Sequence, residues 1–400
     1  MSIHMSDTVK TWQAQIHEAQ ANATPLRIRG AGTKDFYGTC VGDVLDTRAH
    51  AGIVSYEPTE LVVTVRAGTP WSELTRVLDE RQQCLPFEPP FVAQGATVGG
   101  VVNAGLTGAA RLYVGGIRDY VLGAHLLNAQ GEWLKFGGQV MKNVAGYDVS
   151  RLLVGSRGTL GLMTQVSLKV MPQPKVVHTL SLNCDFRSAQ MLCRRFLVKP
   201  IAITGSAWLD GVLTVRLAGM AAAVSVGVTM LDDWARELAS GAFTPVGDVE
   251  AANFWTALQE QSQPHFNVPP SDEHALWRAV LPTAADGLAV HADTGLAMWG
   301  GALRWLWAVE DLSVPFKAAG GHATCYRAPL SGRACIATPT GSAEERLQSA
   351  LKTQFDPKHI FNRHRFDPAS PPGPATVAAH HVPYCNRRAE KRSGRAGKPR

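Results

Sequence analysis

Three clusters of small residues have the composition of loops that bring backbone N–H groups close to a phosphate. Glycine lacks a Cβ atom, so the amides of such a loop can point at an anion. Two of the clusters combine glycine with a hydroxyl side chain and lead directly into an apolar segment. A tight turn explains any single glycine pair better, but three clusters together favour a phosphate-binding site. The clusters are Gly30, Ala31, Gly32, Thr33 and Lys34; Ala96, Thr97, Val98, Gly99 and Gly100; and Gly158, Thr159, Leu160 and Gly161.

The first cluster does not match the two common nucleotide-binding motifs. In the dinucleotide fingerprint G-x-G-x-x-G the third glycine would fall at position 35, which is occupied by Asp35. Residues 36–38 do not begin a convincing helix, and the cluster also fails the P-loop spacing. A strand followed by an exposed loop rich in N–H groups is the interpretation that remains.

Length and composition indicate an ordinary globular protein. The chain has 400 residues, 45% of them hydrophobic, which suits two domains of roughly 100 to 200 residues each. No apolar run approaches the roughly 18 residues of a spanning helix, and residues 1–20 lack a signal-peptide pattern, so we expect a cytoplasmic protein. Seven scattered cysteines without a C-x-x-C pair predict no disulfide framework, no zinc site and no iron–sulfur cluster.

The formal charge of +6 is concentrated in the last residues of the chain. Residues 367–400 contain seven Arg and Lys against two acidic residues, so they carry +5 of the total. This segment is rich in Pro, Ala and Gly and poor in large apolar residues, which predicts a disordered, solvated tail. We therefore expect no nucleic-acid partner, although a basic arm that touches nucleic acid or acidic lipid is the alternative.

The elements that would position the clusters alternate between strand, loop and helix. Apolar spacing predicts a helix over residues 9–19 after the capping residues Ser6 and Asp7, and a second helix from Pro70 with Thr69 as its cap. Later in the chain we expect a hairpin around the turn Asp210-Gly211 and a helix over residues 230–238. A buried strand with a glycine bulge is expected over residues 297–307. Strands are predicted over residues 26–29, 53–56, 61–65, 121–128 and 162–170.

These stretches together resemble a known family. The runs PLRIRGAG, YEPTELVVTVRAGTPWSEL, ATVGGVVNAG and GYDVSRLLVGSRGTLGLMTQVSLKVMPQP are similar to the FAD-binding domain of the vanillyl-alcohol oxidase flavoprotein family. The similarity is strong over about residues 26–172 and weak over 355–362. It implies an α+β fold, in which two α+β subdomains that hold FAD are followed by an α+β cap domain. The implied domains are 1–172 for FAD, 173–366 for the cap and 367–400 for the tail.

The resemblance also assigns roles to the glycine clusters. It implies that residues 30–34 and 96–100 cradle the pyrophosphate of FAD, and that Asn103 and Gly105 approach the isoalloxazine. Residues 158–161 would line the adenosine or the ring side. At Gly99 and Gly158 we expect that a Cβ atom would collide with the ligand or demand an unfavourable φ.

Departures from the family pattern are informative as well. Covalent members often attach FAD through His in the first loop, whereas residues 30–38 contain neither His nor Cys, so we expect non-covalent FAD. The usual ending F-N-P-G-R is replaced by residues 361–365, FNRHR, which affects how the last strand packs. The H-G-x-G-N-x-H run of larger 2-hydroxy-acid-oxidising relatives is missing, and residues 291–293 do not replace it.

Candidate catalytic residues lie in the second half of the chain. Oxidation of a 2-hydroxy acid needs a hydride acceptor, a base for the hydroxyl proton and a cation for the carboxylate. His322, which follows a glycine pair, is the candidate base, although a structural, hydrogen-bonded role is the more common one for such a residue. Arg304 and Arg327 are the candidate cations.

The resemblance finally implies a function and partners. It is closest to the smaller flavin-binding type of subunit in bacterial 2-hydroxy-acid oxidase complexes. It therefore implies a second flavin-binding subunit, an iron–sulfur subunit and peripheral membrane association through that complex, on the inner face of the cytoplasmic membrane. A self-sufficient FAD-dependent oxidase, a non-catalytic interaction subunit and an NADPH-dependent enolpyruvyl reductase of the same fold remain as alternatives.

Overall fold

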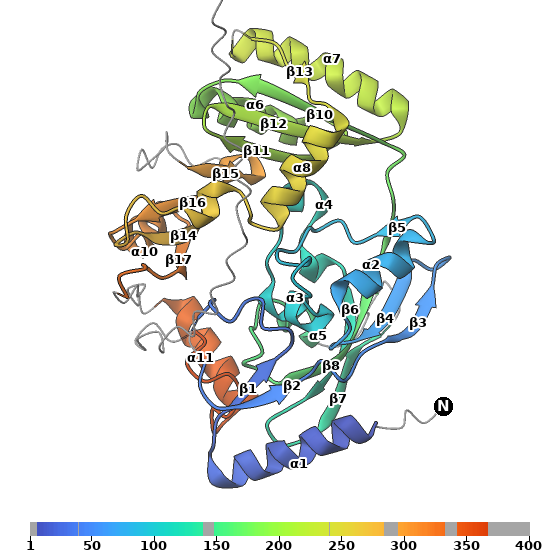
Figure 1. The fold of residues 1–400 in the computed structure, drawn as a ribbon, viewed down its shortest axis with the longest axis vertical. Helices are drawn as coiled ribbons and strands as arrows, with labels where there is room; N and C mark the ends of the chain where they lie inside the picture. Colours follow the sequence, from blue (N-terminus) through green and yellow to red (C-terminus); the bar gives the residue numbers. More distant parts are fainter. Residues whose placement is uncertain are drawn as a thin grey trace, which may run out of the picture.

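A computed structural model describes residues 6–38, 40–138, 148–239, 241–283, 295–332 and 342–366. These residues form a mixed α+β structure with two lobes, as expected (Figure 1). The first lobe holds residues 6–172 together with 342–366, and the second lobe holds residues 176–327. The predicted tail, residues 367–400, and residues 291–293 lie outside the described residues.

A five-stranded antiparallel sheet forms the centre of the first lobe. Its order is β3-β4-β8-β6-β7, so the strand latest in sequence, β8, lies in the middle and is buried on both faces. This burial explains the nearly continuous apolar run that predicted the strand. The strands are β3 Ile53–Glu57, β4 Val62–Arg66, β8 Leu162–Lys169, β6 Val121–Leu127 and β7 Trp133–Gly137.

Two helices cover this sheet and complete its core. Helix α2, Trp71–Asp79, buries Trp71, Leu74 and Leu78, and helix α3, Val98–Ala104, buries the valines of its first two turns. Pro70 precedes α2 without a side-chain cap, so the predicted capping role of Thr69 is wrong. The Thr69 hydroxyl instead accepts a hydrogen bond from the Gly52 N–H at 2.9 Å. Short elements connect these parts: β5 Gln83–Cys84, α4 Arg111–Val114, η1 Ile117–Asp119, α5 Val149–Leu152 and β9 Met171–Pro172.

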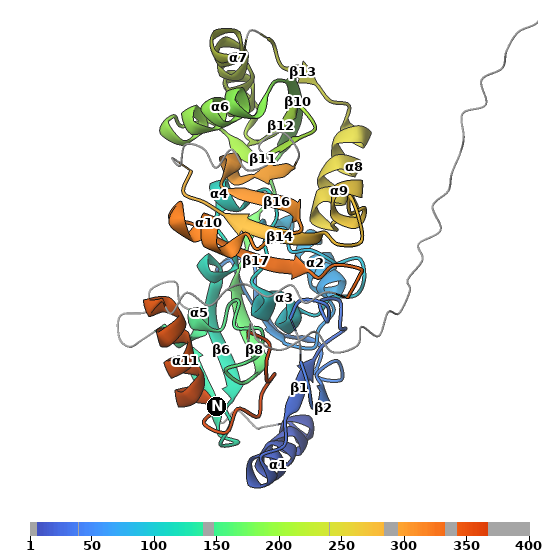
Figure 2. The same ribbon diagram turned by 90° about the vertical axis from the view of Figure 1, so that its left-hand side faces the viewer.

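The beginning and the end of the described chain meet at the bottom of the first lobe (Figures 1 and 2). Helix α1, Asp7–Asn22, is capped by the Ser6 side chain, as predicted, and packs on the parallel pair β1 Leu26–Arg29 and β2 Asp43–Asp46. After helix α11, Ala343–Phe355, the chain returns to this pair, where Phe361 bridges to Leu26 and is fully buried. The departure from the family ending therefore leaves this packing intact.

The second lobe is built on an eight-stranded sheet. Its order is β13-β10-β12-β11-β15-β16-β14-β17, and every pairing in it is antiparallel. Its strands are β10 Val176–Asn183, β11 Ile203–Leu209, β12 Val212–Gly219, β13 Thr244–Pro245, β14 Ala275–Val280, β15 Leu296–Met298, β16 Leu303–Ala308 and β17 His322–Arg327. Its helices are α6 Phe186–Val198, α7 Ala221–Leu238, α8 Asp248–Gln259, α9 Pro264–Asn267 and α10 Ser313–Ala318.

Two predictions for this lobe need revision. Residues 297–307 do not form one strand with a bulge, because β15 and β16 pair with each other as a hairpin. Gly300 and Gly301, with φ of 65° and 89°, lie in the turn η2, Trp299–Gly301, and reverse the chain. Helix α7 begins nine residues before the predicted start at residue 230. The hairpin at Asp210-Gly211 is confirmed, and both residues have positive φ. None of the helices in the described ranges is long and apolar enough to cross a membrane.

Candidate functional site: a cleft lined by glycine-rich loops

A cleft in the first lobe lies where the loop after β1, the start of α3 and residues 157–158 converge. It encloses about 740 Å³ of empty space, part of which is open to solvent. Its walls therefore come from segments that are far apart in the sequence. The lining residues are Ile28, Arg29, Gly30, Ala31, Gly32, Thr33, Lys34, Asp35, Tyr37, Thr47, Ala67, Thr97, Gly99, Gly100, Asn103, Ala104, Arg157, Gly158, Met163, Asn362 and Arg365.

The first loop follows β1 and needs glycine at two positions. A Cβ atom on Gly30 would lie 2.3 Å from the Thr97 hydroxyl, so the absence of a side chain lets this loop approach α3. Gly32 has a φ of 75°, which L side chains rarely adopt, and a Cβ there would collide with the Arg29 guanidinium. The Arg29 side chain in turn donates to Asp35 at 2.7 Å. The loop is thus held in a shape that leaves backbone facing the cleft.

The second cluster forms the start of helix α3. Thr97 caps the helix, because its hydroxyl accepts a hydrogen bond from the Gly100 N–H at 3.2 Å. A Cβ atom on Gly99 would lie 2.7 Å from the Ala67 Cβ and 3.0 Å from the Ala67 carbonyl oxygen. The nearest obstacle to a side chain at this glycine is therefore the protein itself, at the crossing of the helix and the loop after β4.

The third cluster contributes only Gly158 to the lining. The φ of Gly158 is 72°, so the expectation that a side chain would demand an unfavourable φ here is confirmed. A Cβ atom on Gly158 would also lie 2.6 Å from the Asn362 side-chain nitrogen. Asn362 accepts a hydrogen bond from the Ile28 N–H at 2.8 Å and donates one to the Arg157 carbonyl at 2.7 Å. Asn362 thereby joins the first and third loops.

Other predicted cofactor residues lie behind the lining. Ala96 and Val98 are buried in the core of the first lobe, and Leu160 packs there as well. Gly105 has a φ of 65°, and a Cβ on it would meet the Gly155 backbone at 2.7 Å. Thr159 donates a hydrogen bond to the Ser156 carbonyl, and a Cβ atom on Gly161 would meet the Leu127 carbonyl. All of these residues position the loops rather than line the cleft.

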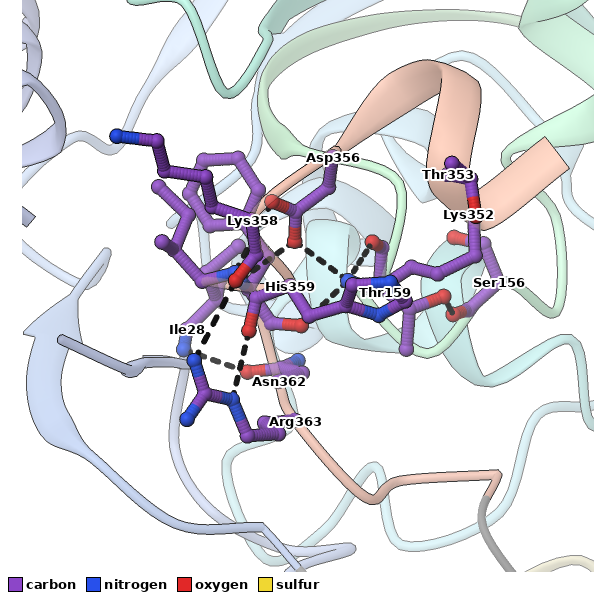
Figure 3. Close-up of polar contacts among 12 residues, drawn as sticks. Ile28, Ser156, Thr159, Lys352, Thr353, Asp356, Lys358, His359, Asn362 and Arg363 are labelled. Atoms are coloured by element: carbon purple, nitrogen blue, oxygen red, sulfur yellow. Dashed lines mark hydrogen bonds and ion pairs between the residues drawn. The ribbon is translucent and has the colours of Figure 1, made fainter. Parts of the chain in front are cut away.

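A buried ion pair fixes the returning C-terminal segment (Figure 3). The Lys352 ammonium donates to the Thr159 carbonyl at 2.7 Å, to the Phe361 carbonyl at 2.8 Å and to the Asp356 carboxylate. Asp356 is fully buried and also accepts from the Ile360 and Phe361 N–H groups, at 3.0 and 2.8 Å. The protons of the ammonium and the oxygens of the carboxylate are thus satisfied. This network places Asn362 and Arg365 in the wall of the cleft.

The cleft is rich in positive charge. Burial lowers the pKa of Lys34 to about 8, against a smaller opposing effect of Glu260. The Arg157 guanidinium lies 3.7 Å from the centre of the Tyr37 ring, and Arg365 donates to the Gly38 and Lys34 carbonyls at 3.0 and 3.2 Å. Sequence reasoning missed Arg157, Arg365 and Asn362. The unusual F-N-R-H-R ending was the one signal that pointed to the last two.

The three candidate catalytic residues do not line this cleft. Arg304 is buried in the second lobe, where its guanidinium lies 4.9 Å from the Phe186 ring centre and Nε donates to the Gly301 carbonyl. Arg327, at the opposite end of β17 from His322, donates to the Phe266 carbonyl at 3.1 Å. His322 is exposed at the start of β17, and partial burial of its ring with the nearby charge of Arg278 lowers its pKa. The structure therefore separates these side chains instead of grouping them.

Comparisons with known proteins agree with this geometry. An FAD-binding domain family matches residues 5–137. The glycolate oxidase subunit GlcE of Escherichia coli (strain K12) is 40% identical over 87% of this chain and 94% of that protein. The chain belongs to the GlcE family of FAD-binding flavoproteins. The GlcD subunit of glycolate oxidase from Bacillus subtilis (strain 168) is 35% identical over 39% of this chain and 34% of that protein.

A solved structure shows the same fold. Crystalline p-cresol methylhydroxylase with bound substrate superposes with a TM-score of 0.64 at 15% identity, covering 89% of this chain and 86% of that chain. The chain therefore shares its overall fold with that protein. The chain is an FAD-dependent oxidoreductase, and FAD is its cofactor.

The residues of the cleft fit FAD. A dinucleotide carries two negative charges on its diphosphate, and the cleft offers Lys34, Arg157 and Arg365 together with backbone that Gly30 and Gly158 leave uncovered. Backbone amides next to glycine are suited to close contact with phosphate oxygens. In this GlcE-family chain we infer that residues 30–34, 99–100 and 157–158 hold the diphosphate, and Asn103 and Tyr37 also line the cleft.

Proposed function

We propose that this chain is the FAD-binding subunit of a complex that oxidises glycolate, and that it passes electrons from the substrate towards an iron–sulfur partner. The observation that carries the proposal is the 40% identity that extends over 94% of a glycolate oxidase subunit. Bound FAD supplies the hydride acceptor for such an oxidation. The residues of the chain bind FAD, orient it and present a positively charged environment to an anionic substrate.

The division into two lobes supports an FAD-binding part over residues 1–172, but it adds residues 342–366 to this part, because Asn362 and Arg365 line the cleft. The cap, predicted over 173–366, is therefore proposed to end before residue 342. Electrons that arrive at the flavin must be passed on before the next turnover. Among the described residues, no group of Cys, His, Asp or Glu could hold a metal ion. We propose that a second flavin-binding subunit and an iron–sulfur subunit complete the complex, and that the complex lies against the inner face of the cytoplasmic membrane.

We further propose that FAD is held without a covalent bond. Residues 30–38 contain no His or Cys. The nearest thiol, Cys40, donates to the Asn362 side-chain oxygen at 3.4 Å, and burial raises its pKa, which makes it a weak nucleophile. Acid precipitation is expected to release the yellow chromophore into the supernatant, whereas a yellow pellet would contradict this proposal.

Assembly provides the test of function. The chain is produced alone and together with the two partner subunits, and glycolate-dependent dye reduction is measured in both preparations. Turnover is expected only in the assembled complex. If the isolated chain turns over glycolate as fast as the complex, it is a self-sufficient oxidase. Bleaching of its flavin by NADPH without glycolate would instead identify a reductase.

A further inference from the structure

A cluster of cations lies at the junction of the two lobes, outside the lining of the cleft. Arg111 belongs to α4 of the first lobe and Arg278 to β14 of the second. Their guanidinium groups lie 4.6 and 5.4 Å from the centre of the Trp299 ring. Trp299 itself belongs to the η2 turn and donates from its indole nitrogen to the Gly108 carbonyl at 2.7 Å. Helix α4 packs on β11 and on this turn (Figure 2), so the cluster combines both lobes.

Tyr37 connects the cluster with the cleft. Tyr37 lines the cleft, is buried, and packs 5.0 Å from the ring of Tyr326 on β17. Burial would raise the pKa of Tyr37, but the nearby charges of Arg157 and Arg278 bring this pKa below its ordinary value. Positive charge from both lobes therefore converges on the Tyr37 hydroxyl.

The charges of Arg111 and Arg278 are not balanced by direct carboxylate partners in the described part of the chain. Among those residues, no carboxylate forms an ion pair with either guanidinium. Asp119, which acts on Arg111 from a distance, accepts a hydrogen bond from the Gly116 N–H at 2.8 Å. Burial also disfavours the charged form of Arg278. Buried charge that is not compensated is costly, and an anionic ligand removes that cost.

We propose that Arg111, Arg278 and Tyr37 form a binding site for a small carboxylate, assembled only where the two lobes meet. The inference rests on the proposed function and gives its substrate a location. Guanidinium groups bind carboxylates with strong, charge-assisted hydrogen bonds. Tyr37, which lines the cleft proposed for FAD, would contribute its hydroxyl to the hydroxyl oxygen of a 2-hydroxy acid.

Carboxylate binding can be measured without turnover. The FAD-loaded full-length chain is titrated with glycolate and with oxalate under anaerobic conditions, and the Kd is read from the perturbation of the visible flavin spectrum. Arg278→Met keeps an unbranched, largely apolar side chain and removes the guanidinium with its charge. It is expected to raise both Kd values about tenfold to a hundredfold, the effect of losing a hydrogen bond to a charged group, with an unchanged FAD content. Arg278→Lys should recover part of the loss.

Controls keep this test decisive. Arg236→Gln removes an exposed cation on α7, where it pairs with Asp233 and not with the cluster around Trp299, and should leave both Kd values unchanged. If Arg278→Met fails to fold, Arg111→Gln on the exposed surface of α4 replaces it and should raise both Kd values at least fivefold. Unchanged Kd values in a folded, FAD-loaded variant overturn the site. Wild-type protein that binds both carboxylates but is not reduced by glycolate, alone or in the complex, supports the site while contradicting the proposed oxidation.

Discussion

The cleft of the first lobe and the open turns of the second lobe use glycine for different purposes. In the cleft, Cβ atoms on Gly30, Gly99 and Gly158 would approach other segments to within 2.3, 2.7 and 2.6 Å, so these glycines let loops converge. In the second lobe, a Cβ atom on Gly211 or Gly247 would meet nothing within 4 Å, and Gly211 serves a hairpin turn. The cleft glycines are therefore needed for close approach between separate segments, whereas these two second-lobe glycines are not.

The largest expected effect is that of Gly99→Val. The new side chain meets Ala67, including its backbone, which cannot move without displacing β4, so both the fold and FAD binding should suffer. We expect a loss of about 3 kcal/mol in the free energy of unfolding, typical of overpacking, together with loss of flavin. Denaturant unfolding and the visible spectrum measure the two. This differs from the expectation that a Cβ atom at Gly99 would collide with the ligand or demand an unfavourable φ, because the obstacle is Ala67 and the φ of Gly99 is not positive.

The matched change in the second lobe is Gly247→Ala, at a glycine with an ordinary φ of −60° and open space around it. It should alter the free energy of unfolding by less than about 0.5 kcal/mol. Equal losses for Gly99→Val and Gly247→Ala would refute the contrast between the lobes.

A smaller effect is expected for Asn362→Ala. The substitution leaves the Ile28 N–H and the Arg157 carbonyl without their partner, at a cost of about 2 kcal/mol in unfolding free energy. It should also speed the release of flavin, measured by filtration through a size-exclusion membrane. Asn267→Ala is the control, because that exposed amide bonds to the Gln261 carbonyl in the second lobe and its loss should leave flavin release unchanged.

The third effect concerns pH. The pKa of Lys34 is lowered to about 8, so its ammonium is charged below pH 8 and neutral above it. If Lys34 faces the diphosphate, affinity for FAD is constant below about pH 7 and falls as the pH rises through 8. Lys34→Arg keeps the charge over this range and should remove the step. A step that persists in Lys34→Arg would assign it to another group.

The smallest effect is expected for His322→Gln. The residue is exposed at the start of β17 and lies outside the cleft, so FAD content and the Kd of FAD should change by less than about twofold. Fluorescence titration of the apoprotein with FAD measures this. A tenfold weaker affinity would place β17 against the cofactor and remove the distinction between the lobes.

Prediction from sequence succeeded for features that are determined by residues close together in the sequence. The cap at Ser6, the turn at Asp210-Gly211 and the buried strand β8 depend on neighbouring residues, and each was recognised. Residues 30–34 were correctly predicted to lie in the binding site, because a cluster of glycines indicates that the backbone comes close to another group. The family and its cofactor followed from the same stretches.

Prediction failed where the decisive partner is distant in sequence. Gly300-Gly301 was interpreted as a bulge, because nothing local shows that β15 and β16 pair with each other. Arg304 and Arg327 were named as candidate cations for the substrate carboxylate, yet they bond to carbonyls within the second lobe. Arg157, Arg278 and Arg111 become conspicuous only when the lobes are brought together around Tyr37 and Trp299.

The return of Asn362 to β1 has a consequence for biosynthesis. The hydrogen bond from Ile28 to Asn362 spans 334 positions, so the ribosome makes one wall of the cleft at the start of translation and another near its end. A nascent chain that has exposed only residues 1–172 lacks Asn362 and Arg365. FAD can therefore be held at full affinity only after the second lobe has been synthesised and the C-terminal segment has docked. Binding of FAD at full affinity therefore requires that the ribosome has synthesised the chain past the last described helix, α11. A prematurely terminated chain would lack this full affinity for its flavin.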